Sequence, residues 1–151
     1  MSKYIGVSVK RKEDERFVAG KGRYTDDIVL PNMTYAHIVR SPHAHAKLRS
    51  INVDKARAHP GVVAVFTGKD MQDDGVASVP NAWGIGEDMK EPPHPPLAVG
   101  KVRHVGDGVV VVIAEDRYIA KDAAELVEVD YEVLPAVADA AEAIKLGAPA
   151  V

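Results

Sequence analysis

The feature that most constrains the fold is the run GVVVVIA at residues 108–114. Its five consecutive residues from Val109 to Ile113 are all branched at Cβ, which favours a strand over a helix. Both faces of such a strand are apolar and must be covered, which requires a central position in a sheet. A Gly-Asp-Gly turn precedes the run and Asp116 follows it, so the predicted strand is short and bounded at both ends.

Five other segments have patterns typical of strands, and they lie at residues 33–40, 46–53, 62–68, 101–105 and 127–133. Residues 33–40 carry apolar groups at most positions, which predicts burial on most of both faces. In residues 46–53 apolar and polar side chains alternate imperfectly. In residues 127–133 apolar and acidic side chains alternate regularly, which predicts a strand with one buried face and one solvent-exposed face. Residues 101–105 and the valine run flank the turn at residues 106–108.

Short helices are predicted between these strands. Asp54 is placed to cap a helix over residues 54–59, and Asp116 one over residues 116–126 with a stripe of small apolar residues. Asp139 is a possible cap for a short helix near the C-terminal end, and one further helical turn is expected after Gly68. The predicted fold class is therefore α+β, with a mixed sheet packed with a few short helices.

Length and patterning divide the chain into an arm and a domain. A chain of 151 residues fits one hydrophobic core. Residues 1–32 are polar and have too few periodic apolar positions to bury themselves, so we expect a loosely held arm. Residues 33–151 form the domain, which an irregular loop at residues 72–98 interrupts. That loop is longer than an ordinary connection and is a candidate for partner binding.

Composition excludes several classes of protein. The chain has no cysteine, so it cannot ligate an iron-sulfur cluster through thiolate or build a cysteine zinc site. No apolar run is long enough for a membrane span and no signal peptide is recognisable, so we expect a cytoplasmic protein. Residues 1–60 contain 12 basic and 6 acidic residues and the remainder 7 and 16, but the basic residues are scattered. We therefore expect no nucleic-acid partner.

Two histidines, His43 and His45, stand in the stretch RSPHAHAKL at residues 40–48. On an extended backbone they would point to the same side, which is acceptable for two metal ligands. A metal site needs more ligands, and no other candidate has a diagnostic spacing (His37, His59, His94 or an acidic residue). We interpret both as turn or core residues. His94 and His104 are equally isolated as acid-base candidates.

Other patterns are incomplete as functional motifs. Gly20-Lys21-Gly22-Arg23 lacks the strand and helix of a phosphate loop, and Gly84-Ile85-Gly86 lacks the third glycine of a dinucleotide motif. We interpret Asp26 and Asp27 as a turn or helix cap. The acidic residues of the last predicted strand, Glu128, Asp130 and Glu132, are interpreted as a solvated face. Catalytic, cofactor-binding and metal-ligating residues are therefore all assigned as none.

Five motifs, taken together, carry a family resemblance. In chain order they are GKGRYTDDIVLPNM, RSPHAHAKL, HPGVVAVFTGKDM, VRHVGD and DAAELVEVDYEVLPAV. The chain resembles the N-terminal α/β hammerhead domain of the large, molybdenum-binding subunit of the xanthine dehydrogenase and aldehyde oxidase family, and within it the carbon monoxide dehydrogenase-like branch most. The resemblance runs from about Gly20 to Val151, outside the proline-rich loop. It makes RSPHAHAKL a signature of the fold and not a catalytic motif.

The resemblance implies an oxidoreductase that hydroxylates aldehydes or heteroaromatic compounds, or oxidises carbon monoxide. Its cofactors would be molybdopterin-bound molybdenum in the full subunit, with 2Fe-2S clusters and FAD in the full complex. The cofactor-binding motifs of the family belong to later domains, so we expect this chain to hold no cofactor and to be inactive alone. Its implied role is structural and inter-subunit packing. Its implied partners are the remaining domains of the large subunit and the iron-sulfur and FAD subunits, with no membrane partner.

The turn at Gly106-Asp107-Gly108 departs from the family pattern, which usually has proline at the third position. Without proline we expect a looser turn. Two other functions stay open at this point. One is a free-standing protein-binding module that uses the proline-rich loop around Trp83 and residues 91–96. The other is a minimal metalloenzyme built on His43 and His45.

Overall fold

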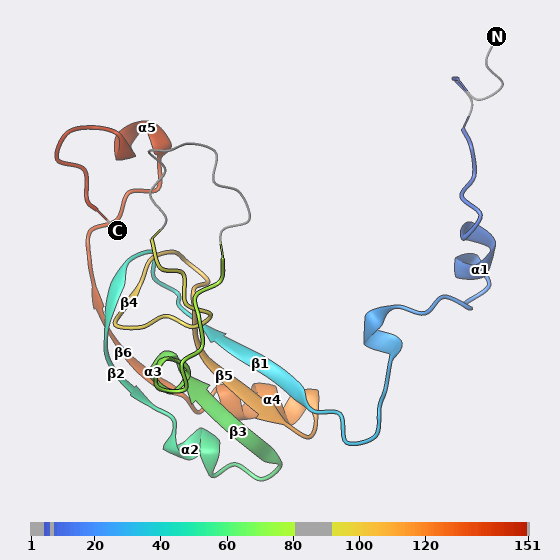
Figure 1. The fold of residues 1–151 in the computed structure, drawn as a ribbon, viewed down its shortest axis with the longest axis horizontal. Coiled ribbons are helices and arrows are strands. Elements are labelled where there is room, and N and C mark those ends of the chain that lie inside the picture. Colours follow the sequence, from blue (N-terminus) through green and yellow to red (C-terminus); the bar gives the residue numbers. More distant parts are fainter. Residues whose placement is uncertain (1–4, 7, 81–91, 151) are drawn as a thin grey trace. The chain divides into compact units, whose positions relative to one another are not determined.

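The computed structural model describes residues 5, 6, 8–80 and 92–150, and the chain forms two compact units, Met1–Met33 and Thr34–Val151 (Figure 1). The first unit contains helix α1 (Asp14–Val18) and the 3-10 helix η1 (Thr25–Asp27). None of its described residues is buried. Its order comes from local contacts, such as the stacked rings of Phe17 and Tyr24, whose centroids lie 5.6 Å apart.

The second unit contains two three-stranded sheets. In the first sheet, β5 (Gly108–Ala114) lies between β1 (Tyr35–Arg40) and β3 (Val62–Thr67). Both pairings are antiparallel. Val109, Val110 and Val112 of β5 are fully buried, so the central position predicted for the valine run is confirmed.

In the second sheet, β2 (Ala46–Asn52) lies between β4 (Lys101–Val102) and β6 (Glu128–Val133), again with antiparallel pairing. The α+β hammerhead fold class is confirmed, but the described strands form two antiparallel sheets in place of one mixed sheet. The segments that flank the turn at residues 106–108 form no hairpin, because β4 pairs with β2 whereas β5 pairs with β1 and β3. Strand pattern identifies strands, and it does not select their partners.

Two strands show burial that their sequence patterns did not predict. In β2 the register shifts between Leu48 and Ser50, so the inward positions change from Ala46 and Leu48 to Ile51. This β-bulge accounts for the imperfect alternation. In β1 half-buried and exposed residues alternate along the strand. Burial on both faces was therefore wrong for β1, which is an edge strand.

The helices begin at residues that satisfy exposed backbone donors. The Asp116 side chain accepts a hydrogen bond from the Tyr118 amide (2.7 Å) and caps α4 (Arg117–Ala124), as predicted. Asp139 caps α5 (Ala140–Ala143), also as predicted. The predicted cap at Asp54 is wrong, because Asp54 is the first residue of α2 (Asp54–Arg57). Its own amide donates to Asn52 Oδ1 (3.0 Å).

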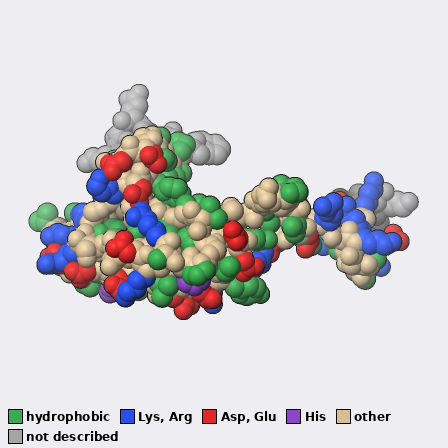
Figure 2. Space-filling model, turned by 90° about the horizontal axis from the view of Figure 1, so that it is seen from below, with side chains coloured by type: hydrophobic (Ala, Val, Ile, Leu, Met, Phe, Trp, Pro, Cys, Tyr) green, Lys and Arg blue, Asp and Glu red, His purple; other side chains and the backbone are tan. Residues whose placement is uncertain are grey.

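Helix α3 (Gly68–Asp73) follows β3 directly and starts with a reciprocal cap between Thr67 and Asp70. The core of the second unit draws on both sheets together with α2 and α4. Its buried members are Ala46, Val53, Ala56, Val65, Ala98, Val102, Val109, Val110, Val112, Ala123 and Ala124. On the face shown in Figure 2, acidic and basic side chains of this unit are interspersed.

Candidate functional site

The stretch RSPHAHAKL connects the two sheets, because it leaves β1 at Arg40 and enters β2 at Ala46. Ser41 is almost fully buried and exchanges two backbone hydrogen bonds with the turn after β4. The Ser41 amide donates to Asp107 O and the Gly106 amide donates to Ser41 O, both at 2.8 Å. Arg40 Nη1 donates to Gly106 O, also at 2.8 Å. The stretch therefore docks on the turn at residues 106–108.

That turn is also held from its other side. Asp107 Oδ2 accepts a hydrogen bond from the Arg103 amide (3.0 Å), and Gly108 O accepts one from the Ala98 amide (2.7 Å). Gly106 has a φ of 89°, a left-handed conformation that favours glycine. These contacts counter the loosening expected from the missing proline.

His45 and His43 have different surroundings. The His45 ring is buried, and its Nδ1 lies 2.8 Å from Pro135 O. Because a carbonyl oxygen only accepts, Nδ1 carries the proton. His45 Nε2 is buried and has no partner among the described residues. His43 instead packs edge-on against the Tyr131 ring, with centroids 5.0 Å apart.

The described residues contain no group of three or more His, Asp or Glu side chains that could hold a metal ion. A single imidazole nitrogen sealed in the core, such as His45 Nε2, is not a ligand set for molybdenum or zinc. The surroundings of His43 and His45 agree with the interpretation as turn and core residues, and the described residues do not fit a molybdenum site.

Glu128 and Asp130 of β6 are exposed, as interpreted from the sequence, whereas Glu132 is half-buried. Two of these three carboxylates form ion pairs. Glu132 lies 3.5 Å from Lys47 Nζ and 3.2 Å from Arg49 Nη2. Glu128 accepts a hydrogen bond from Lys55 Nζ, which raises the pKa of that ammonium group. Exposed pairs of this kind contribute little stability each. They place acidic side chains of β6 opposite basic side chains of β2 and α2.

The candidate residues of the arm have structural contacts. Asp27 Oδ2 accepts a hydrogen bond from the Tyr24 amide (2.9 Å), which confirms Asp27 as a helix cap. Gly22 lies against the Phe17 ring, where an added Cβ would be 2.8 Å from Cδ1. The Lys21 amide donates to Arg16 O at the end of α1. Gly20 to Arg23 therefore form the turn after α1.

Two cavities adjoin the segment Pro92–Pro96. The first, about 510 Å³, is lined by Val79, Pro80, Pro92, His94, His104, Asp107 and others, and the second, about 330 Å³, by Met71, Val76, Pro96, Val99 and others. Both include Ser78, Pro93, Pro95 and Arg103. The sequence showed no signal for Arg103, which only the tertiary structure brings to the prolines. Trp83 and Gly84–Gly86 lie outside the described residues.

The comparisons with known proteins match this geometry to a family. The family model "Aldehyde oxidase and xanthine dehydrogenase, a/b hammerhead domain" matches residues 19–135, which is most of the chain. The chain belongs to this family. The resemblance read from the five motifs is therefore confirmed.

No helix in the described part of the chain is long and apolar enough to cross a membrane.

Relatives within the aldehyde oxidase and xanthine dehydrogenase family include subunits of several enzymes. The chain is 44% identical to the carbon monoxide dehydrogenase large chain of Afipia carboxidovorans, over 96% of this chain and 17% of that one. It is 43% identical to the xanthine dehydrogenase molybdenum-binding subunit of Escherichia coli O157:H7, over 80% of this chain and 16% of the relative.

Among solved structures, quinoline 2-oxidoreductase from Pseudomonas putida 86 superposes with a TM-score of 0.83 at 43% identity. The match covers 93% of this chain and 18% of that one. The chain thus spans less than a fifth of the length of these relatives. It corresponds to one domain of a molybdenum hydroxylase large subunit.

Proposed function

We propose that the chain acts as a structural and inter-subunit packing domain of a molybdopterin-dependent hydroxylase. By analogy with the named relatives, the whole enzyme oxidises carbon monoxide, an aldehyde or a heteroaromatic compound. Molybdopterin-bound molybdenum would be held by the rest of the large subunit, with 2Fe-2S clusters and FAD in partner subunits. The domain itself performs no turnover, and we place the assembly in the cytoplasm.

The observation that carries this proposal is the exposure of large apolar side chains on the arm. Val18 is 90% exposed, Val29 75% and Leu30 61%. The tail shows the same feature, with Ile144 at 87%. Apolar residues gathered on a segment with no buried residue of its own mark a surface that other protein covers. Burying one such side chain contributes about 1.5–3 kcal/mol to association.

The larger unit is held together between its two sheets. Hydrogen bonds between Ser41 and the turn at residues 106–108 join its two sheets, and core residues from both sheets pack together. A unit that is already ordered loses little conformational entropy when its own surface binds a partner.

The test is co-purification of the chain with the iron-sulfur and FAD subunits from source cells. The double variant Val29→Asp with Leu30→Asp should lose these subunits, because it places charge in the apolar contact. The control, Val29→Ile with Leu30→Met, keeps the positions apolar and should retain them. Both variants should melt like the wild type, because neither residue is buried. Retention of the subunits by the double aspartate variant would overturn the proposal.

Family membership does not favour the free-standing binding module considered from the sequence. An immunoblot of source cells with an antibody against this chain separates the two functions. We expect a band several times larger than 16.2 kDa, or a 16.2 kDa chain that co-purifies with the other subunits. A chain of 16.2 kDa without these subunits would support the module.

A further inference from the structure

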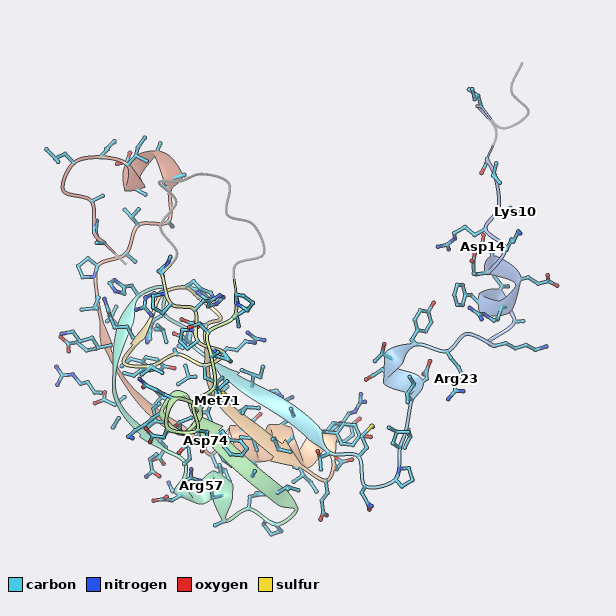
Figure 3. All side chains as sticks on the ribbon, in the orientation of Figure 1. Lys10, Asp14, Arg23, Arg57, Met71 and Asp74 are labelled. Carbon is cyan, nitrogen blue, oxygen red and sulfur yellow. The ribbon has the colours of Figure 1, made fainter. Side chains whose placement is uncertain are left out.

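The two cavities beside Pro92–Pro96 are neighbours, because they share the lining residues Ser78, Pro93, Pro95 and Arg103. The residues that line the two cavities come from separate parts of the second unit. Helix α3 contributes Met71, labelled in Figure 3, and the turn after β4 contributes Arg103 and His104. At about 510 and 330 Å³ the two cavities have the size of ligand and peptide pockets. We call the two cavities together the proline groove.

The wall of the proline groove is restrained on both sides. Four of the five residues Pro92–Pro96 are proline, which fixes their φ near −65°. The Val79 amide donates to His94 O (2.8 Å), so the two loop segments lie side by side, as Figure 1 shows. The Ala98 amide donates to Gly108 O (2.7 Å) and ties the following residues to β5. Because these residues are already restrained, they would lose little conformational entropy when a partner binds.

The proline groove contains one cationic side chain without a described ion-pair partner and one carboxylate. Arg103 lines both cavities, and its guanidinium forms no ion pair with any described residue. Asp107 also lines the groove, but its side chain is only 16% exposed. Its Oδ2 accepts the Arg103 amide and lies 3.8 Å from His104 Nδ1. His94 and His104 add further nitrogen atoms to the lining.

We propose that the proline groove binds an extended acidic segment from the remainder of the large subunit, with Arg103 as the anchor for its carboxylate. Arginine presents a planar fork that matches a carboxylate. Prolines supply apolar surface and have a carbonyl acceptor but no amide donor, so the backbone of a bound segment would meet them only as a donor. The inference rests on the proposed packing function, and relatives carry most of their polypeptide outside the region matched here.

The test uses the full chain and two acetylated hexapeptides, one of alternating glutamate and leucine and one with glutamine in place of glutamate. Binding is followed through backbone amide NMR signals. We expect the glutamate peptide to shift the signals of Val79, His94 and Arg103 and to bind about tenfold more tightly than the glutamine peptide. Added salt should lower the affinity of the glutamate peptide more than that of the glutamine peptide, because salt screens the interaction between charges.

Variants of Arg103 connect this preference to the anchor. Arg103→Gln should abolish the preference for glutamate, and Arg103→Lys should retain part of it, because lysine keeps the charge without the fork. The control Lys121→Gln removes the same charge from α4, away from the residues that line the groove, and should change nothing.

Three results would overturn the inference: equal binding of the two peptides, no shift at the groove with either, or an unchanged preference in Arg103→Gln. None of these results changes the expected outcome of the co-purification test, because that test uses variants of the arm and not of the groove. Failure of the groove with retained co-purification therefore sinks this inference alone. If the proposed packing function is wrong, the wild-type chain itself should fail to co-purify with the iron-sulfur and FAD subunits.

Discussion

Nδ1 of His45 lies 2.8 Å from the carbonyl oxygen of Pro135, although the two residues are 90 positions apart in the chain. The Leu134 amide donates to the His45 carbonyl (2.9 Å) beside this contact. The pair of hydrogen bonds joins the start of β2 to the segment after β6. His45 of the RSPHAHAKL motif therefore stabilises the fold by linking two segments that are distant in the chain.

His45→Leu should lower the free energy of unfolding by about 1–3 kcal/mol, because it leaves the Pro135 carbonyl without its donor. His45→Asn should cost less, because an asparagine amide nitrogen can reach the position of Nδ1 and donate. Urea unfolding of the two variants and the wild type measures both values. Equal losses would show that ring volume, and not the hydrogen bond, is what matters at this position.

Gly68 stands at the start of α3, where an added Cβ would lie 2.3 Å from Ala98 O. A backbone oxygen cannot yield easily, so Gly68→Ala should cost about 3 kcal/mol or more. Gly108→Ala is the matched control, because the nearest neighbours of its Cβ would be the side chains of Leu97 and Ile38, at 3.2 and 3.3 Å, and the backbone oxygen of Pro96 would lie at an ordinary contact distance of 3.6 Å. We expect that control to cost less than about 1 kcal/mol. Thermal unfolding distinguishes the two, and comparable costs would contradict the clash.

Asp70 gives the stability a dependence on pH. Hydrogen bonds from the amide and hydroxyl of Thr67 hold the pKa of Asp70 below its usual 3.8. A lowered pKa means that the folded state binds the proton less readily than the unfolded state. The stabilisation is therefore present above pH 3.8 and is lost as pH falls through the folded-state pKa.

Asp70→Asn should accordingly cost about 1 kcal/mol at pH 7, and the difference from wild type should shrink as the pH falls below about 4. Asp74→Asn, at the C-terminal end of the same helix and labelled in Figure 3, is the control for loss of one negative charge. Unfolding curves across pH provide the measurement. A difference that stays constant with pH would exclude the carboxylate as its source.

The isolated chain should contain no stoichiometric molybdenum when it is purified from a strain that makes molybdopterin. It has no cysteine, and its described residues form no cluster of metal ligands. Elemental mass spectrometry provides the test, with carbon monoxide dehydrogenase as the positive control. One molybdenum per chain would contradict the assignment of the cofactor to the rest of the subunit.

Hydrogen exchange should separate the arm from the domain. In the isolated chain, the amides of Val29 and Leu30 should exchange fast, because these residues are exposed, whereas Val110 and Val112 in the centre of the first sheet should be protected. In the assembled enzyme the arm amides should become slow. Slow exchange throughout the arm of the isolated chain would show that it needs no partner.

Much of the fold could be read from local pattern. The β-branched run at Val109–Ile113 required a central strand, and the aspartates at 116 and 139 cap the helices that follow them. These features depend on residues a few positions apart, where propensity and capping act. The failed cap at Asp54 shows the limit, since Asn52 accepts its amide and shifts the helix start.

By itself the sequence determined where the strands lie, except that β4 ends at Val102 and not at residue 105, and it also determined the caps at Asp116 and Asp139 and, through five ordered motifs, the family. Only the tertiary structure decided that β4 and β5 join different sheets, that His45 reaches Pro135, and that Arg103 lies beside Pro93 and Pro95. The physical reason is that pairing, burial and charge environment depend on residues distant in the chain. Alternation and spacing report only which face of its own element a residue occupies.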